Sequence, residues 1–277
     1  MAAFALLWAG LAIACTSYDL RISRALVQPG SLWAAFGQRF GELPGMTAFA
    51  LAALALYSEP VPLGRSRFTR EMPWLLCSPA LTVELALCAF RIFQERLGPL
   101  GWACTLVGTS LTTRAWRRRW AVGRTLPAHV RTACVWTVRL TISTCLLVSL
   151  LKLGWGRVRF RDLSPLASEF TPWYSPQGWT GHSSFPSGHA VLGWLLLPTL
   201  LLWPRGSRGN RWAFASSFAW GLFVALSRVV IGAHYASDVL FSSALVFAMM
   251  ALAPWRPRRP EAQRPAGVGA GAPDAGK

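Results

Sequence analysis

The sequence predicts an all-α, polytopic membrane protein, and three observations lead to this fold class. Of the 277 residues, 53% are hydrophobic, and the mean hydropathy is +0.37. Only 14% are charged, well below the share of about 25% that is usual in soluble domains. The arginines gather between long apolar runs. A bundle of membrane-spanning helices accounts for all three observations.

Eight apolar segments are candidates for spans, because a helix needs about 20 mostly apolar residues to cross a bilayer. Segment 190–204 is short, and segment 73–93 contains Glu84 and Arg91, so one pair of spans stays open. In chain order the candidates are 2–18, 44–63, 73–93, 98–113, 132–151, 190–204, 211–231 and 236–254.

The two ends of the chain differ from the segments between them. The first apolar segment lacks a basic n-region, so we expect an uncleaved span rather than a signal peptide. Residues 256–277 are rich in Pro, Ala, Gly and Arg, which predicts a disordered basic tail. The integral membrane domain is therefore expected to cover residues 1–255.

Charged loops predict the orientation in the membrane. With eight spans, four basic segments fall on one side, and the positive-inside rule makes that side cytoplasmic. These segments are 65–70, 114–131, 205–211 and the tail. Both termini are then cytoplasmic in an inner (cytoplasmic) membrane protein, and the outer connections are 19–43, 94–97, 152–189 and 232–235.

Composition also argues against two classes of partner. The net charge of +17 would suggest nucleic acid in a soluble protein, but here the arginines are better read as loop charges. The six cysteines lack a Cys-x-x-Cys spacing, so we expect small buried side chains and neither disulfides nor a metal cluster.

Three stretches on the predicted outer face combine residues suited to phosphate chemistry: 152–159, 185–189 and 227–238. In the third, His234 and Asp238 are four residues apart and share a face if a helix starts near His234. Asp238 can then fix the imidazole tautomer and leave the other nitrogen free as a nucleophile or base. A helix-capping polar cluster is an equal alternative for these two residues alone.

The other two stretches supply anion-binding groups. Ser187 is a plausible N-cap, Gly188 permits close backbone approach, and His189 follows at the start of an apolar run. Lys152, Arg159 and Arg228 add cations that can hold phosphate oxygens, although Lys152 taken alone is better interpreted as a headgroup anchor. Arg157 and Arg161 flank Arg159, so spacing alone does not select one arginine. No carboxylate cluster for Mg²⁺ is present, so we expect neither metal nor other cofactor.

Together the stretches resemble the signature of the type-2 phosphatidic acid phosphatase family. The family pattern is Lys-x6-Arg-Pro, then Pro-Ser-Gly-His, then Ser-Arg-x5-His-x3-Asp. This chain has Lys152-x6-Arg159, Pro186-Ser187-Gly188-His189 and Ser227-Arg228-x5-His234-x3-Asp238. Phe160 stands where the family usually has proline, which puts the path of that loop in doubt. The resemblance implies a six-helix phosphatase core, with motifs within residues 132–254 and two extra spans.

The resemblance also implies roles for these residues. His234 would attack phosphorus and form a phosphohistidine, Asp238 would orient His234, and His189 would protonate the leaving oxygen and later activate water. The phosphate oxygens would be held by five residues, namely Lys152, Arg159, Ser187, Gly188 and Arg228. The implied activity is metal-independent hydrolysis of a lipid phosphate or pyrophosphate at the outer face.

The substrate and some polar residues are less determined. Among family substrates the outward site favours undecaprenyl pyrophosphate or a related bacterial lipid phosphate, with phosphatidylglycerol phosphate, phosphatidate and lipid A as alternatives. A transporter or receptor for phosphorylated lipid is the competing class. Glu42, at the outer start of the second span, is a candidate to brace the site, whereas Glu84 is either functional or part of a misplaced span. Loop 160–185 carries aromatic residues typical of a membrane interface or of a lid.

Overall fold

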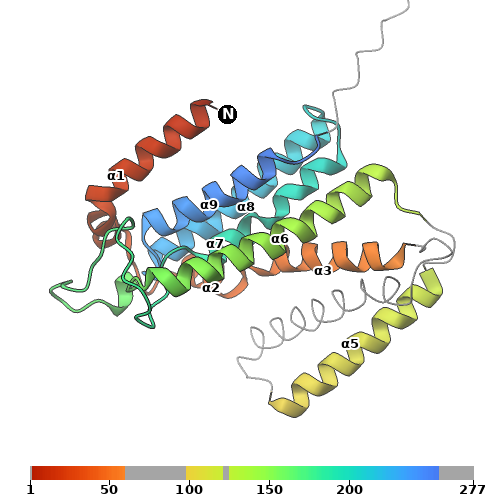
Figure 1. Cartoon of the computed structure of the whole chain (residues 1–277), viewed down its shortest axis with the longest axis horizontal. Helices are drawn as coiled ribbons and strands as arrows, with labels where there is room; N and C mark the ends of the chain where they lie inside the picture. Colours follow the sequence, from red (N-terminus) through yellow and green to blue (C-terminus); the bar gives the residue numbers. More distant parts are fainter. Residues whose placement is uncertain (1, 60–97, 121–124, 256–277) are drawn as a thin grey trace, which may run out of the picture.

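The computed structural model describes residues 2–59, 98–120 and 125–255, and these residues form helices and connecting loops without a β-strand. Figure 1 shows an elongated bundle in which most helices run roughly along one axis. The helices are α1 (Ala2–Leu26), α2 (Leu32–Phe40), α3 (Leu43–Ser58), α5 (Pro99–Trp120), α6 (Ala128–Trp155), η1 (Phe160–Asp162), α7 (Gly188–Gly193), η2 (Trp194–Leu202), α8 (Arg208–Val230) and α9 (Ala236–Ala251).

Within the described residues, three helical segments are long and apolar enough to cross a membrane. They are Leu32–Ser58, Ala128–Asp162 and Arg208–Val230, and two shorter apolar segments, Gly188–Leu202 and Ala236–Ala251, lie beside them. An all-helical membrane protein agrees with the prediction. The predicted span 73–93, with Glu84, lies outside the described residues, so the count of eight spans stays a prediction.

The main hydrophobic core lies where α6, η2, α8 and α9 pack together. Three residues of this core are completely buried: Leu140 of α6, Leu195 of η2 and Val246 of α9. The Trp194 and Phe247 rings pack in an edge arrangement with centroids 5.0 Å apart, and the Trp194 indole donates a hydrogen bond to Ser243 Oγ at 2.8 Å. This core fixes the ends of the four helices relative to one another.

The short predicted span 190–204 changes helix type partway along its length. It begins as α7 and continues as the 3₁₀ helix η2, which contains Pro198. Proline has no N–H to donate, and a 3₁₀ helix rises about 2.0 Å per residue against 1.5 Å for an α-helix. The 15 residues Gly188–Leu202 therefore reach about 27 Å, close to the roughly 30 Å of a bilayer core.

The predicted outer loop 19–43 is instead mostly helical, because α1 runs to Leu26 and α2 follows after a short turn. Helix α1 contacts α9, and α2 packs closely on α8. At the α2–α8 contact, a Cβ added to Gly37 would lie 2.5 Å from Ser227 Cβ, so only glycine permits this approach. Both N-terminal helices thus reach the end of the bundle that carries the three motif stretches.

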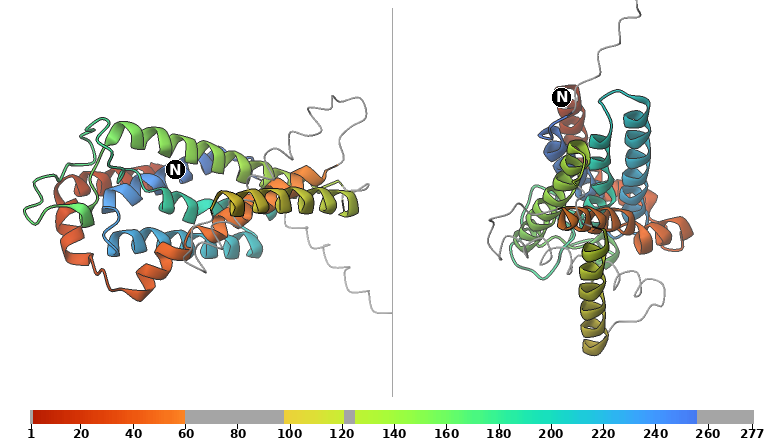
Figure 2. Two further views of the ribbon diagram at one scale, coloured as in Figure 1. Left: turned by 90° about the horizontal axis from the view of Figure 1, so that it is seen from below. Right: turned by 90° about the vertical axis from the view of Figure 1, so that its right-hand side faces the viewer.

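Helix α5 stands apart from the rest of the bundle and contacts α3 (Figure 2). Cys104 on this helix is exposed, so the expectation of buried cysteines is wrong for this residue. Cys15 is buried, while Cys134 and Cys145 are partly buried, and all four are free thiols. Cys77, Cys88 and the predicted tail 256–277 lie outside the described residues.

Candidate active site

The three motif stretches meet at one end of the bundle (Figure 1). Lys152 lies in the last turn of α6 and Arg228 in the last turn of α8. His189 lies at the start of α7, and Asp238 lies in the first turn of α9. The turn between η2 and α8, which carries Arg205, lies at the opposite end of the bundle. The predicted topology likewise puts the motif stretches and this basic turn at opposite ends of the bundle.

His234 and Asp238 form the predicted pair, although the geometry differs from a shared helix face. Helix α9 begins at Ala236, after His234, with Tyr235 as its N-cap residue. Asp238 turns back over the start of the helix, where Oδ2 accepts the backbone N–H of Tyr235 at 3.0 Å. The same oxygen lies 3.4 Å from His234 Nδ1. The same Asp238 carboxylate thus caps the start of α9 and contacts His234. The two alternatives raised by the sequence, an oriented histidine and a helix-capping cluster, are therefore both present.

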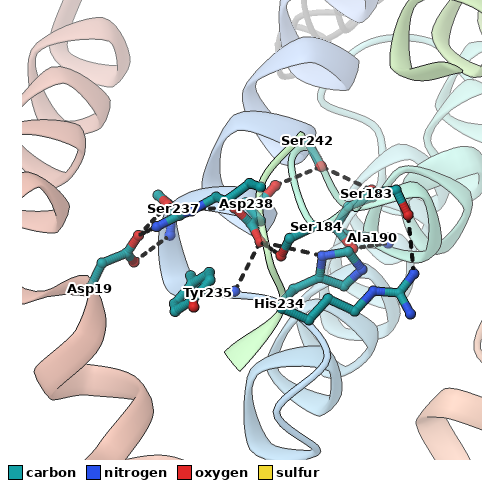
Figure 3. A network of polar contacts seen from close by, with 12 residues as sticks. Asp19, Ser183, Ser184, Ala190, His234, Tyr235, Ser237, Asp238 and Ser242 are labelled. Atoms are coloured by element: carbon teal, nitrogen blue, oxygen red, sulfur yellow. Dashed lines mark hydrogen bonds and ion pairs between the residues drawn. The ribbon is translucent and has the colours of Figure 1, made fainter. Parts of the chain in front are cut away.

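Asp238 is fully buried and is held by further donors besides the cap (Figure 3). Ser184 donates its hydroxyl to Oδ2 at 2.5 Å, and Arg157 donates Nη1–H to Oδ1 at 2.6 Å. A carboxylate held on both oxygens has little freedom to rotate. Its orientation toward His234 is therefore set by residues from three separate parts of the chain.

Arg157 connects this carboxylate to the N-terminal helix. Its guanidinium is 1% exposed and forms a second ion pair, from Nη2 to Oδ2 of Asp19 on α1, at 2.8 Å. Arg157 Nε–H also donates to the carbonyl oxygen of Thr171 at 2.9 Å, and the guanidinium lies over the Tyr235 ring. Asp19 in turn accepts the backbone N–H of Ser237 at 2.9 Å. Figure 3 shows Asp19 on the side of Asp238 away from His234.

Sequence reasoning did not identify Asp19 and did not choose Arg157. One signal was available for Asp19: the chain has 11 acidic residues against 28 basic ones. An acid close to the end of an apolar segment is therefore unusual in this sequence, and it needs a partner if it is buried. Nothing local to Asp19 indicated that this partner lies 138 residues further along the chain.

Burial determines the protonation of His234, which lies in the turn between α8 and α9. Desolvation lowers the pKa of its imidazole to about 3, and the charges of Arg228 and Lys152 act in the same direction, whereas Asp238 opposes them. The ring is therefore neutral over the physiological pH range and gains a proton only as the pH falls toward 3. In a neutral imidazole whose Nδ1–H faces a carboxylate, Nε2 has no proton, and its lone pair is free to react with another group.

The three predicted cations also come together. Lys152 interacts electrostatically with Arg159 and Arg228. Arg159 makes a 3.4 Å contact from Nη2 to Ser183 Oγ, and its buried Nε has no hydrogen-bond partner among the described residues. Arg228 donates from Nη1 to Gln38 Oε1 of α2 at 3.2 Å. Like charges held close together repel, so such a group gains stability when it binds an anion.

The Pro-Ser-Gly-His stretch forms the start of α7 as predicted. Ser187 is its N-cap residue, and its hydroxyl oxygen accepts the backbone N–H of Ala190 at 3.3 Å, which confirms the capping prediction. A Cβ added to Gly188 would meet no atom within 4 Å, so open space adjoins this glycine. Phosphate binding by Ser187 and Gly188 stays a prediction.

Phe160 stands where the motif pattern that this chain resembles has proline, and the backbone before it has the conformation that proline favours. Arg159 is extended, with φ −74° and ψ 151°, and proline restricts the residue before it to this region. Phe160 is the first residue of η1, a position that tolerates proline because no helical hydrogen bond requires its N–H. The substitution therefore does not redirect the Arg159 backbone.

We expect Phe160→Pro to change the free energy of unfolding by no more than about 1 kcal/mol, because proline fits this position and reduces the entropy of the unfolded chain. Arg161→Pro is the matched control, since the Arg161 N–H donates to the Gly232 carbonyl at 3.0 Å and proline would remove this bond. Thermal unfolding in detergent measures the stability of both variants. Equal destabilisation by the two prolines would contradict the conclusion that residue 160 tolerates proline.

The remaining sequence candidates are distributed around the site. Glu42 reaches His189, with Oε1 2.5 Å from Nε2. His182 is exposed in the loop that precedes α7, whereas the Trp173 indole donates to the Ala12 carbonyl of α1 at 3.2 Å. Trp179 is 82% exposed. Within residues 2–59, 98–120 and 125–255, no three or more His, Cys, Asp or Glu side chains group as metal ligands would.

Comparison with known proteins gives the following matches. Residues 132–260 match the family model described as the PAP2 superfamily. The lipid A 1-phosphatase of Rhizobium etli is 38% identical over 99 residues, which cover 34% of this chain and 38% of that protein. The phosphatidylglycerophosphatase B of Escherichia coli is 33% identical over 78 residues, which cover 27% and 30% of the two chains.

The aligned regions cover only part of this chain and of each relative. The chain spans roughly a third of the length of these curated relatives, at 38% and 30%. No solved structure matches the chain. The N-terminal residues that contact the site, Asp19, Gln38 and Glu42, lie outside the matched segment 132–260.

Proposed function

We propose that the protein is a PAP2-type membrane lipid phosphatase that works through a phosphohistidine intermediate, a proposal supported by the match of residues 132–260 to the PAP2 superfamily model. The observation that carries the proposal is the contact between neutral, buried His234 and Asp238 beside the cations of Lys152 and Arg228. A binding protein needs the cations alone, whereas an imidazole oriented by a carboxylate is the arrangement of an activated nucleophile.

In the first step, the lipid phosphate binds against Lys152, Arg159 and Arg228. Several donors around the equatorial oxygens stabilise the transferring phosphoryl group. The Nε2 lone pair of His234 attacks phosphorus as the bond to the lipid oxygen breaks. His189 gives its proton to the leaving oxygen, so the lipid departs as an alcohol or, from a pyrophosphate, as a monophosphate.

In the second step, water attacks the phosphohistidine. His189, now without its proton, accepts one from the attacking water as the new P–O bond forms and the N–P bond breaks. Inorganic phosphate leaves, and both histidines return to their starting protonation states. Asp238 supports both steps, because it stabilises the positive charge that develops on the His234 ring.

The proposed setting is the outer face of a bacterial inner membrane. The motif end of the bundle lies opposite the basic η2–α8 turn, and the positive-inside rule assigns such turns to the cytoplasm. Exposed Trp179 and Leu166, at 82% and 89%, suit the boundary between headgroups and acyl chains. The substrate then enters from the outer leaflet.

The substrate is a bacterial lipid phosphate, for which the sequence favours undecaprenyl pyrophosphate. The printed names of the relatives point to lipid A and to phosphatidylglycerol phosphate as substrates of those proteins. All three offer a terminal phosphate that the proposed cations can hold. The shared chemistry is a phosphate group on a membrane lipid.

A substrate panel in detergent tests the proposal. We expect the purified wild type to release phosphate from at least one of undecaprenyl pyrophosphate, phosphatidylglycerol phosphate, lipid A and phosphatidate. Release should persist in EDTA, because cationic side chains fill the metal's role, and vanadate should inhibit it as a phosphate mimic. Binding of these lipids without any phosphate release would instead favour the transporter or receptor class, and strong preference for a soluble phosphate would overturn the lipid assignment.

A further inference from the structure

The second histidine of the site also has a carboxylate partner, and this partner comes from outside the matched segment. Glu42 lies in the turn between α2 and α3, and its Oε1 is 2.5 Å from His189 Nε2. The Glu42 side chain is 9% exposed and that of His189 is 31% exposed. The pair is therefore largely shielded from water on the glutamate side, while part of the imidazole stays accessible.

The carboxylate of Glu42 does not cap the helix that Glu42 begins. Glu42 is the N-cap residue of α3, yet its side chain makes no capping hydrogen bond. Glutamate is also not among the residue types that favour this position, which are Ser, Thr, Asp and Asn. A buried carboxylate is costly unless it has a partner, and His189 is a partner that the structure provides.

Close packing of α3 on α7 brings the two residues together. A Cβ added to Gly45, one turn after Glu42, would lie 2.1 Å from the Leu192 carbonyl oxygen of α7. No side chain fits in that space, so glycine at residue 45 is required for the approach. This close approach of the two helices brings Glu42 within reach of His189.

The cations of the proposed phosphate site explain how the Glu42–His189 contact can assist the chemistry. His189 must carry a proton to act as an acid, but the proposed phosphate site is lined by Lys152, Arg159 and Arg228, which disfavour another positive charge. A carboxylate in contact with the ring favours its protonated form and turns the contact into a charge-assisted hydrogen bond. The contact also limits rotation of the ring.

We propose that Glu42 is the positioning residue of His189: it holds the imidazole through Nε2 and favours the protonated ring, whose proton on the other nitrogen, Nδ1, passes to the leaving oxygen. This inference rests on the proposed phosphatase function. It makes the site a pair of histidine–carboxylate units, His234 with Asp238 for attack and His189 with Glu42 for proton transfer. The second unit depends on the N-terminal part of the chain.

The test compares substrates that differ in how much they need the acid. The lipid substrate is phosphatidate or, if the wild type prefers it, phosphatidylglycerol phosphate, since both release a primary alkoxide that requires a proton. The second substrate is p-nitrophenyl phosphate, whose phenolate leaves without one. The kcat/KM value reports formation of the phosphoenzyme, the step in which His189 acts as acid.

We expect Glu42→Gln to lower kcat/KM on the lipid by about 10- to 100-fold, less than the roughly 10²- to 10⁴-fold of general acid catalysis because His189 itself remains, and on p-nitrophenyl phosphate by less than about threefold. Glu169→Gln, the same change at an exposed loop residue bonded to Ser164, should leave both values unchanged. Glu42→Asp keeps the charge with a shorter reach, so its loss on the lipid should be smaller than that of Glu42→Gln.

Three outcomes would overturn the inference: no loss on either substrate, equal loss on both, or a full further loss when Glu42→Gln is added to His189→Ala. The last comparison is informative because residues acting through one another are not additive. If Glu42→Gln does not fold, Glu42→Asp answers the same question through its ratio between substrates. A wild type that releases no phosphate from any substrate would instead refute the phosphatase function itself.

Discussion

Replacing His234 with alanine is expected to lower phosphate release by roughly 10³-fold or more, since loss of a covalent nucleophile removes the main route of reaction. In the structure, His234 is 2% exposed and is oriented by Asp238 through a 3.4 Å contact. No neighbouring imidazole can take its position, because His189 lies on another helix and contacts Glu42. Steady-state release from the preferred lipid measures the effect.

The intermediate gives an independent measurement. Wild-type protein quenched during turnover of a radiolabelled lipid phosphate should retain label on protein in a bond that survives base and is cleaved by acid, as expected for phosphohistidine. His234→Ala should retain none. His182→Ala is the matched control, because His182 is exposed in the loop that precedes α7, and this variant should behave as wild type. Normal turnover by His234→Ala would refute the mechanism.

The largest effect on stability is expected at Arg157. Arg157→Met keeps much of the side-chain volume but leaves the carboxylates of Asp19 and Asp238, 1% and 0% exposed, without their shared cation. Removal of one partner from a buried ion pair costs about 3–5 kcal/mol, because the remaining charge stays buried. Activity should fall as well, since Asp238 loses the bond that fixes Oδ1. Thermal unfolding in detergent and phosphate release measure the two effects.

Two further variants show whether the effect comes from the buried charge. Arg161→Met is the matched control: the Arg161 side chain is 39% exposed and lies 3.8 Å from Asp162, and such surface pairs contribute about 0–1 kcal/mol. Asp19→Asn combined with Arg157→Met should recover part of the lost stability, because one of the two unpaired charges is removed. If Arg157→Met proved as stable as Arg161→Met, the buried network would not hold the site together.

Local patterns in the sequence predicted much of the molecule. Apolar length and low charge predicted the helical membrane class, and the Pro186–His189 pattern predicted the N-cap of α7 at Ser187. These features depend on residues within a few positions of one another. The motifs also placed Lys152, Arg228 and His234 in one group, which the structure brings to one end of the bundle.

Other features depend on which helices become neighbours, and periodicity does not specify this. The segment expected to be the loop 19–43 forms the end of α1 and all of α2, and their packing on α9 and α8 brings Asp19 and Gln38 to the site. The choice between Arg157 and Arg159 was open for the same reason. Both are arginines in one short stretch, and only their burial and partners differ.

The sequence by itself determined the helical membrane class of the protein and the residues of the motifs for which phosphate binding is proposed, because hydrophobic length and short-range spacing are local properties. The tertiary structure alone decided how the chemically active groups are supported. Arg157 meets Asp19 across 138 residues, and Glu42 reaches His189 because Gly45 lets α3 approach α7. The physical reason is that a buried charge requires a partner of opposite sign, while the fold decides from which distant segment that partner comes.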